Sequence, residues 1–461
     1  MLSTPTLLRR IGGVLCALVL TLAISLPAKA DVIVGGITVV DGDVPLVSDN
    51  IDLLGTVPVV GAISANFRGN YMFVTGVEGL STFDISNPAL PLLTSFIPLP
   101  HFENEDVSLG GNLLLIANDK SESAAVLYVF DISNPAAPRL RTVFPIGTST
   151  IATSGLPSHT VTCLNGCDFA YLAGSRRGIG ILDLRNPDAP VIAGEFKPPI
   201  TDWATHDVQI DSQGIAWIVG AAGTAAYNIA DPRNPVLVGM TDASATTGPL
   251  NDFIHHNSMR LDKITPTGKR IPSDVVLITE EDYERPTCQD AGSFQTWKIN
   301  GDLTATTPAV LTNLDSWATE LDELTRLEGK SPATVLCSAH WFDEDRGLVA
   351  QGWYEQGTRI LDVRNPADIK QVGYFVMPVT ETWAAYWAPT DSTGQILYTV
   401  DLARGVDILR IQRPAADGPA KKAPVRKQWI GDGSSNTAPA SEFSVAHTSF
   451  GWACRLPDIG E

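Results

Sequence analysis

Histidines are scarce in this 461-residue chain, and four of the seven open similar short segments. The segments read HTVTC, HDVQI, HNSMR and HWFDE, and they begin at His159, His206, His256 and His340. Four neutral imidazoles that face one another in water stabilise each other little, and protonated imidazoles repel each other. Binding of one metal ion accounts for all four. A single histidine is more often a hydrogen-bonded core residue, but four in phase predict a metal centre.

Other residue types occupy the same phase elsewhere in the chain. EDVSL begins at Glu105 and YWAPT at Tyr386, which makes both residues candidates for catalysis. Glu105 would lie beside the imidazoles and either orient a ring N–H or act as a general base on metal-bound water. His255 points away from the neighbouring His256 if both lie in a strand. An all-histidine set favours iron or copper, with zinc as an alternative, over magnesium and calcium, which prefer oxygen.

Charged and aromatic residues lie in the turns expected above this ring. Arg177 and Arg404 could bind an anionic substrate group or pair with a neighbouring carboxylate, and Tyr354 and Glu355 complete the expected substrate-binding set. The run LITEEDYE has enough oxygen atoms for a calcium site, and solvated loop charge is an equal alternative. Its candidate calcium ligands are Glu280, Glu281 and Asp282.

The segments that position these residues form an internal repeat. Each copy contains a β-rich run that ends in a polar turn with proline, as in FDISNPALP from Phe83 and FDISNPAAP from Phe130. The second residues of the first four copies lie 47, 52 and 45 positions apart, which is the length of a four-stranded propeller blade. These markers are Asp84, Asp131, Asp183 and Asn228, and LDVRNPADI from Leu361 is a further copy.

Two weaker copies around Lys298 and Arg410 bring the predicted number of blades to seven. The last copy lacks an outer strand, and Ile51 to Val57 (IDLLGTV) has the missing pattern. The prediction is therefore an all-β, seven-bladed β-propeller that an N-terminal strand closes. A helical insertion after blade five is predicted within residues 304–332, where Asp315 is a plausible N-cap and Gly329 a plausible end.

The ends of the chain predict export. Arg9 and Arg10, the apolar run from Ile11 to Leu26 and Ala28-Lys29-Ala30 read as a cleavable signal peptide at residues 1–30. A lead segment (31–50), the propeller (51–412) and a C-terminal tail (413–461) follow. The expected location is the periplasm or the medium, with no integral membrane anchor after cleavage. In that oxidising setting Cys163 and Cys167 read as a disulfide, because a zinc site would need two more thiolates.

The composition excludes one class of partner. Acids outnumber bases by 51 to 32, and the formal net charge is −19. A nucleic-acid phosphate backbone requires a basic face, and none is visible. Hydrophobic residues make up 44% of the chain, enough for a large core. The expected partner is a small-molecule substrate.

The repeats resemble the LVIVD-repeat family of exported bacterial β-propellers from about residue 51 to 412. This resemblance implies the fold but no single reaction. In its geometry the histidine ring is similar to the four-histidine iron centre of carotenoid-cleaving dioxygenases and to the copper propellers related to methanethiol oxidase. The leading hypothesis is an exported metal-dependent oxidoreductase, either an oxygenase or an oxidase. The alternatives are a metal-dependent hydrolase that uses Glu105 as base and a non-catalytic, partner-binding propeller with a structural metal.

Overall fold

Strands make up nearly all of the regular structure. The computed structural model describes residues 32–34, 37–39 and 46–415, apart from 100–105, 119–124, 148–157, 175–177, 200–204, 222, 242–253, 265–269, 283–291, 320–337 and 378. Within these ranges the helical structure is one 3-10 turn, η1 (Asn165–Cys167). No helix in the described part of the chain is long and apolar enough to cross a membrane. The all-β prediction is therefore confirmed.

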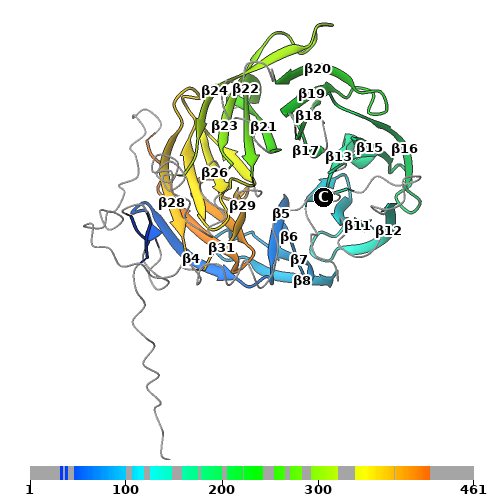
Figure 1. Ribbon diagram of the computed structural model, residues 1–461. Helices are drawn as coiled ribbons and strands as arrows, with labels where there is room; N and C mark the ends of the chain where they lie inside the picture. The colour runs from blue at the N-terminus through cyan, green and yellow to red at the C-terminus, as the bar shows by residue number, and fades with distance from the viewer. Residues whose placement is uncertain are drawn as a thin grey trace, which may run out of the picture.

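Six of the described sheets stand radially around a common axis (Figure 1). Within each four-stranded unit the strands follow one another as an antiparallel meander, and inner strands such as β5, β17, β21 and β29 lie nearest the axis (Figure 1). A separate two-stranded sheet pairs β1 (Val32–Val34) with β2 (Ile37–Val39).

Three four-stranded sheets follow one another in chain order. The first contains β5 (Ala62–Arg68), β6 (Tyr71–Gly76), β7 (Gly79–Asp84) and β8 (Leu92–Pro98). The second contains β9 (Val107–Gly110), β10 (Leu113–Asn118), β11 (Ala125–Asp131) and β12 (Arg139–Gly147). The third contains β13 (Thr160–Leu164), β14 (Phe169–Ala173), β15 (Ile179–Asp183) and β16 (Val191–Phe196).

The turn between β13 and β14 carries a disulfide. Cys163 and Cys167 are bonded across η1, with their Cα atoms 4.6 Å apart. The turn reverses in a left-handed conformation, with φ of 71° at Gly166 and 76° at Cys167. The disulfide predicted from the spacing of these two cysteines is confirmed.

The next two units join into one eight-stranded sheet. Its first half is β17 (Thr205–Ile210), β18 (Ile215–Gly220), β19 (Gly223–Asn228) and β20 (Val236–Thr241). Its second half is β21 (Ile254–Ile264), β22 (Arg270–Glu281), β23 (Phe294–Asn300) and β24 (Ala309–Trp317). The halves meet at their outer strands, where β20 pairs parallel with β24 over Gly239 to Thr241.

Strand β24 corrects the prediction of a helix that starts at Asp315. This residue lies inside the strand, opposite Thr296 of β23, and its carboxylate accepts a hydrogen bond from the Ile369 backbone N–H at 2.7 Å. The strand forms because its apolar residues, among them the fully buried Leu311, complete the sheet. The rest of the predicted helix, from residue 320 to Gly329, lies outside the described residues.

The last two sheets use strands from both ends of the described chain. One contains β25 (Phe342–Asp345), β26 (Leu348–Gly352), β27 (Thr358–Asp362) and β28 (Lys370–Val376), and β3 (Leu46–Val47) of the lead segment extends it. The other contains β29 (Thr382–Trp387), β30 (Ile396–Asp401), β31 (Gly405–Ile411) and β4 (Ile51–Val57). Strand β4 pairs antiparallel with β31 along its length, as the sequence predicts.

The core lies between the faces of neighbouring sheets. Second strands such as β10, β18 and β30 are buried at every position, because a sheet covers each of their faces. Outer strands such as β8 are mostly exposed. The repeated aspartates fix the turns at the outer end of each unit, since their carboxylates accept backbone N–H groups two residues on. These bonds run from Ser86 to Asp84, Ser133 to Asp131, Arg185 to Asp183 and Arg364 to Asp362.

Hydrogen bonds between inner strands join neighbouring units around the axis, and we call these bonds the inner-strand clasps. In most of them a side chain of one unit bonds a backbone group of the next unit. They include Asn66 to the Val107 carbonyl, the Cys163 N–H to the Ser108 hydroxyl, Thr160 to the His206 carbonyl, Thr162 to the Val208 carbonyl, His206 to the His256 carbonyl, Asn257 to the Phe342 carbonyl, His340 to the Trp383 carbonyl, the Trp387 N–H to the Asp343 carboxylate and the Ala65 N–H to the Tyr386 hydroxyl. The clasps hold the inner strands in register with one another.

Candidate metal centre

The four predicted histidines lie at the same end of four successive inner strands. His159 directly precedes β13, His206 and His256 lie near the start of β17 and β21, and His340 lies two residues before β25. Their ring centroids are 4.8 Å apart for His159 and His206, and 4.0 Å for each of the next two pairs. All four are 0–2% exposed. The structure therefore brings the four imidazoles together as consecutive neighbours.

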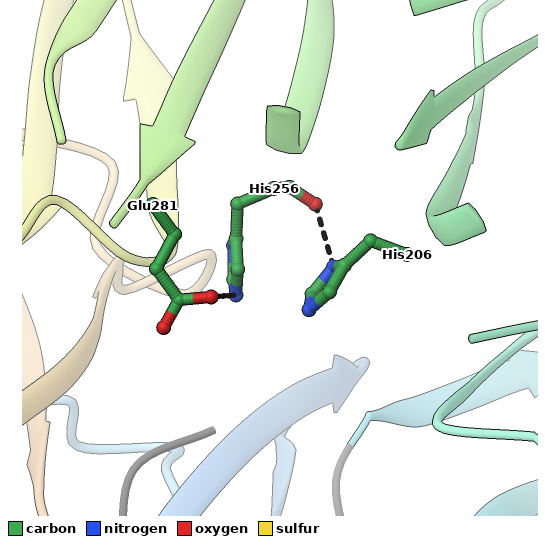
Figure 2. A group of neighbouring side chains, drawn as sticks. All are labelled: His206, His256 and Glu281. Carbon is green, nitrogen blue, oxygen red and sulfur yellow. Dashed lines mark hydrogen bonds and ion pairs between the residues drawn. The ribbon is translucent and has the colours of Figure 1, made fainter. Parts of the chain in front are cut away.

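A carboxylate from a second strand joins the central two histidines. Glu281, at the end of β22, places Oε2 3.7 Å from Nε2 of His256, and the carboxylate points at that imidazole (Figure 2). One potential ligand atom from each of His206, His256 and Glu281 lies within 4.8 Å of the others. Glu281 reaches the ring because β22 pairs with β21 in a register that sets Glu281 opposite Ile254, two residues before His256.

Backbone carbonyls fix the tautomers of two of these histidines. Nδ1 of His206 donates to the His256 carbonyl at 2.9 Å, and Nδ1 of His340 donates to the Trp383 carbonyl at 2.7 Å. A carbonyl only accepts, so Nδ1 carries the proton and Nε2 of the neutral ring keeps its lone pair. Histidines that bind metals are oriented in this way, and the donor set therefore fits a transition metal ion.

Burial keeps the His256 imidazole, at the centre of the ring, uncharged. The pKa of His256 lies well below its usual value, first because the imidazole is desolvated and then because His206, His340 and His159 would repel its positive charge. A metal ligand needs a deprotonated nitrogen. The electrostatics of the ring therefore favour the form of histidine that binds metal.

Tyr354 and Trp383 complete the wall beside His340. The Tyr354 hydroxyl donates to Oε1 of Glu281, and its ring centroid lies 5.0 Å from that of His340. The Trp383 ring lies 5.1 Å from His340 on inner strand β29. Tyr354 is fully buried and contacts the Glu281 carboxylate, and its predicted role in binding substrate stays a prediction.

Tyr386 does not occupy the position predicted for it. It lies three residues beyond Trp383 on β29, and Trp383 is the residue of this strand that contacts His340. The Tyr386 hydroxyl instead lies 3.2 Å from Oγ of Ser64. The predicted position was wrong because the spacing between an inner strand and its marker varies by a few residues between copies, so the count reached Tyr386 instead of Trp383.

The remaining predicted residues lie apart from the ring or outside the described residues. Glu105 and Arg177 lie outside them. Arg404 binds Asp407 of its own hairpin through two hydrogen bonds of 2.8 and 2.9 Å, which is the carboxylate pairing considered above. Glu355 is half-buried in the turn after Tyr354.

The three acidic residues considered for calcium do not converge. Glu280 is buried and accepts hydrogen bonds from Ser293 and Gln295 at 2.9 and 3.2 Å, whereas Glu281 points at the ring. Successive side chains of a strand point to opposite faces, so Glu280 and Glu281 cannot share one ion. Of these three acids, only Glu281 belongs to a group of potential metal ligands among the described residues, and its partners there are His206 and His256. The described residues therefore do not bring these three acids together as one calcium site.

Sequence reasoning missed Glu281 as a partner of the histidines. The signal that could have found it is the register of the β21–β22 hairpin. In this hairpin the end of β22, at Glu281, lies beside the start of β21, where His256 is. The repeat spacing of the histidines cannot identify Glu281, because the histidines belong to inner strands and Glu281 belongs to a second strand.

Comparisons with known proteins identify the repeat and the fold. The LVIVD repeat is found at residues 62–96 and 103–144. No curated protein matches the chain. Among solved structures, the β-propeller domain of Cps50 (Swd1) from Myceliophteria thermophila is 12% identical, with 78% of this chain and all of that chain covered and a TM-score of 0.53. The WD40 repeats of RRP9 are 10% identical, with 80% and 100% covered and a TM-score of 0.49. The chain is thus a β-propeller that carries LVIVD repeats.

Proposed function

We propose that this protein is an exported, metal-dependent oxidoreductase whose metal ion is bound on the propeller axis by His206, His256 and Glu281. The proposal counts the eight-stranded sheet as two blades, which gives seven in all. It includes cleavage after residue 30 and a small-molecule substrate, as the sequence predicts.

The donor set carries this proposal. Two imidazoles and one carboxylate lie within 4.8 Å of one another, and this combination with open positions is typical of non-haem iron(II) oxygenases. We therefore favour iron over copper and zinc. When bound, such an ion supplies redox chemistry with molecular oxygen. The protein provides a His206 imidazole that a backbone carbonyl holds in one orientation, a desolvated His256 imidazole, and a buried site.

The flanking histidines support a second candidate function. His159 and His340 lie next to the central pair, with ring centroids 4.8 and 4.0 Å from their neighbours. If both also bind the ion, the metal is fully coordinated and serves to close the channel of a partner-binding propeller. The complete burial of all four rings favours this alternative.

Two adjacent histidines provide a matched test. His256 faces the ring, whereas His255 faces Thr224 and Trp297, with its Nδ1 2.9 Å from the Thr224 hydroxyl. We expect His256→Ala to weaken iron(II) binding by 100-fold or more, on the order of the largest effect seen for supporting residues of metal sites. His255→Ala should keep wild-type affinity. Anaerobic iron(II) titration of both variants measures this.

Nitric oxide distinguishes the two candidate functions. It binds iron(II) only at an open coordination position, and the product has a characteristic electron paramagnetic resonance spectrum. An oxidoreductase centre should give that spectrum, and a fully coordinated structural ion should not. Wild-type protein that binds no iron, copper or zinc, or equal losses in both histidine variants, would overturn the metal centre itself.

A further inference from the structure

Tyr354 is held in an unusual position between the metal centre and the last sheet. It lies in the turn between β26 and β27 with φ of 39°, a left-handed conformation that is unfavourable for a residue other than glycine. The turn is closed by hydrogen bonds from Trp353 N–H to the Gly357 carbonyl at 2.9 Å and from Gln356 N–H to the Trp353 carbonyl at 2.8 Å. A strained backbone persists only where its surroundings fix it.

The backbone of Tyr354 is also paired with the neighbouring inner strand. Its N–H donates to the Thr382 carbonyl and its carbonyl accepts from the Thr382 N–H, both at 2.9 Å. The side chain is fully buried and packs with Ile63 and Trp383. The ring and the backbone are therefore both fixed, and the position of the hydroxyl is fixed with them.

This hydroxyl binds one oxygen of Glu281. Tyr354 donates to Oε1, while Oε2 faces Nε2 of His256 at 3.7 Å. A hydrogen bond from a neutral donor to a carboxylate stabilises its charged form and fixes its rotation. The phenol thus occupies one oxygen and directs the other toward the imidazoles.

We propose that Tyr354 is a positioning residue that makes Glu281 a one-oxygen ligand of the metal ion. This inference rests on the proposed function, because it requires Glu281 to bind metal. The turn that holds Tyr354 in this left-handed conformation is also the turn that places its hydroxyl at the carboxylate. Tyr354 does not itself contact the ion in this proposal.

Tyr354→Phe tests the inference, because phenylalanine keeps the packed ring and removes the hydroxyl. Without its donor, Glu281 can rotate, and we expect iron(II) affinity to fall roughly 10- to 100-fold, the effect of losing a group that orients a ligand. Tyr398→Phe is the matched control. Tyr398 is also fully buried and donates its hydroxyl to a carbonyl, that of Pro88 at 2.8 Å, but it packs in a different cluster.

Two readouts separate positioning from a general loss of stability. Iron(II) affinity is measured by anaerobic titration against a competing chelator, and thermal melting of the metal-free proteins measures folding. Each variant loses one buried hydrogen bond, so both should melt below the wild type, and Tyr354→Phe at least as far below as Tyr398→Phe because its lost partner is a carboxylate. Only Tyr354→Phe should lose affinity.

A double-mutant cycle completes the test. In a Glu281→Gln protein the ligand is already impaired, so adding Tyr354→Phe should change affinity by less than about twofold, since residues that act through each other are not additive. Independent losses in the cycle, or wild-type affinity in Tyr354→Phe, would overturn the inference while the proposed function stands. Wild-type protein that binds no metal would instead overturn the proposed function.

Discussion

The two ends of the inner strands have opposite characters. Histidines lie within two residues of the start of strands β17, β21 and β25, and three residues after its histidine each strand contributes to a cavity of about 580 Å³. The pairs are His206 and Gln209, His256 and Met259, and His340 and Asp343. Three residues of a strand span roughly 10 Å. The ring and the cavity are thus neighbouring sites on the same strands.

The histidine end is closed and holds neutral imidazoles beside a single carboxylate, whereas the cavity end is open and lined by several charged side chains. At the ring, backbone carbonyls hold two of the imidazoles, those of His206 and His340. At the cavity, carboxylates pair with arginines, as in Asp211 with Arg260 at 3.0 Å and Asp345 with Arg413 at 2.8 Å.

The larger hollow is therefore a poorer candidate for chemistry than the closed ring. A large cavity is the usual first choice for a functional site, and here that rule selects the end without the histidines. Two of its carboxylates, Asp211 and Asp345, already have arginine partners, and no histidine is among its lining residues. The chemical type of the donors, rather than the volume, identifies the candidate site.

The largest effect that separates the two ends is expected from Asp345→Ala. Arg413 is held by Asp345 and lies over the Trp387 ring, 4.6 Å from its centroid, and both charged side chains are less than 20% exposed. Removing the carboxylate takes its partner from a largely buried guanidinium. The free energy of unfolding should therefore fall by about 1–3 kcal/mol, less than for a fully buried pair because both side chains keep some exposure to solvent. Chemical denaturation measures this loss.

Metal binding should not respond to Asp345→Ala, because the pair belongs to the cavity end. Iron(II) affinity equal to that of the wild type would support the separation of the two ends. A tenfold loss of affinity would show that the cavity and the ring form one coupled site.

A smaller effect is expected from pH at the same end. Desolvation raises the pKa of Asp343 to about 7, and the charges of Glu344 and Asp345 add to the rise, while N–H groups of Trp387 and Glu344 oppose it. The folded state therefore binds more protons than the unfolded state between about pH 4 and 7. The stability contribution is present below pH 4 and is lost as the pH rises to 7.

Asp343→Asn should remove this dependence. Between pH 4 and 7 the free energy of unfolding of the wild type should fall by about 1 kcal/mol relative to that of the variant. A fully desolvated group would lose more, about 1.4 kcal/mol for each unit of pKa shift, but Asp343 is partly exposed. Denaturation curves at several pH values measure the difference. Parallel pH profiles would contradict the shift.

Repetition made much of the fold predictable. The polar turn after each marker aspartate is a local hydrogen-bonding unit, so it appears in the sequence wherever it occurs in the structure. The pairing of β4 with β31 followed from a missing outer strand, because a sheet edge needs a partner. Asp315 was interpreted as an N-cap because SWATELDELTRLEG, which follows it, has apolar residues at helical spacing, whereas its role in the structure depends on the distant Ile369 N–H.

The site was predictable only in part, for a related reason. His206 and His256 could be found because neighbouring inner strands repeat their phase, and their rings lie 4.0 Å apart. Glu281 and Tyr354 reach the ring through a hairpin register and a strained turn that occur in single units of the repeat. Features that break a repeat cannot be found by aligning its copies.

The smallest effect is expected from the inner-strand clasp beside the ring. Thr160 donates its hydroxyl to the His206 carbonyl at 2.7 Å, and Thr160→Val removes this bond while keeping the shape of the side chain. The free energy of unfolding should fall by about 0.5–1 kcal/mol. Iron(II) affinity should change less than about twofold, because the bond holds the backbone and not the imidazole. Thr162→Val is the matched control, since Thr162 makes the same bond to Val208 two residues nearer the cavity. Equal losses of stability with unchanged affinity would show that the clasps support both ends alike, whereas a tenfold loss of affinity in Thr160→Val alone would make its clasp part of the metal centre.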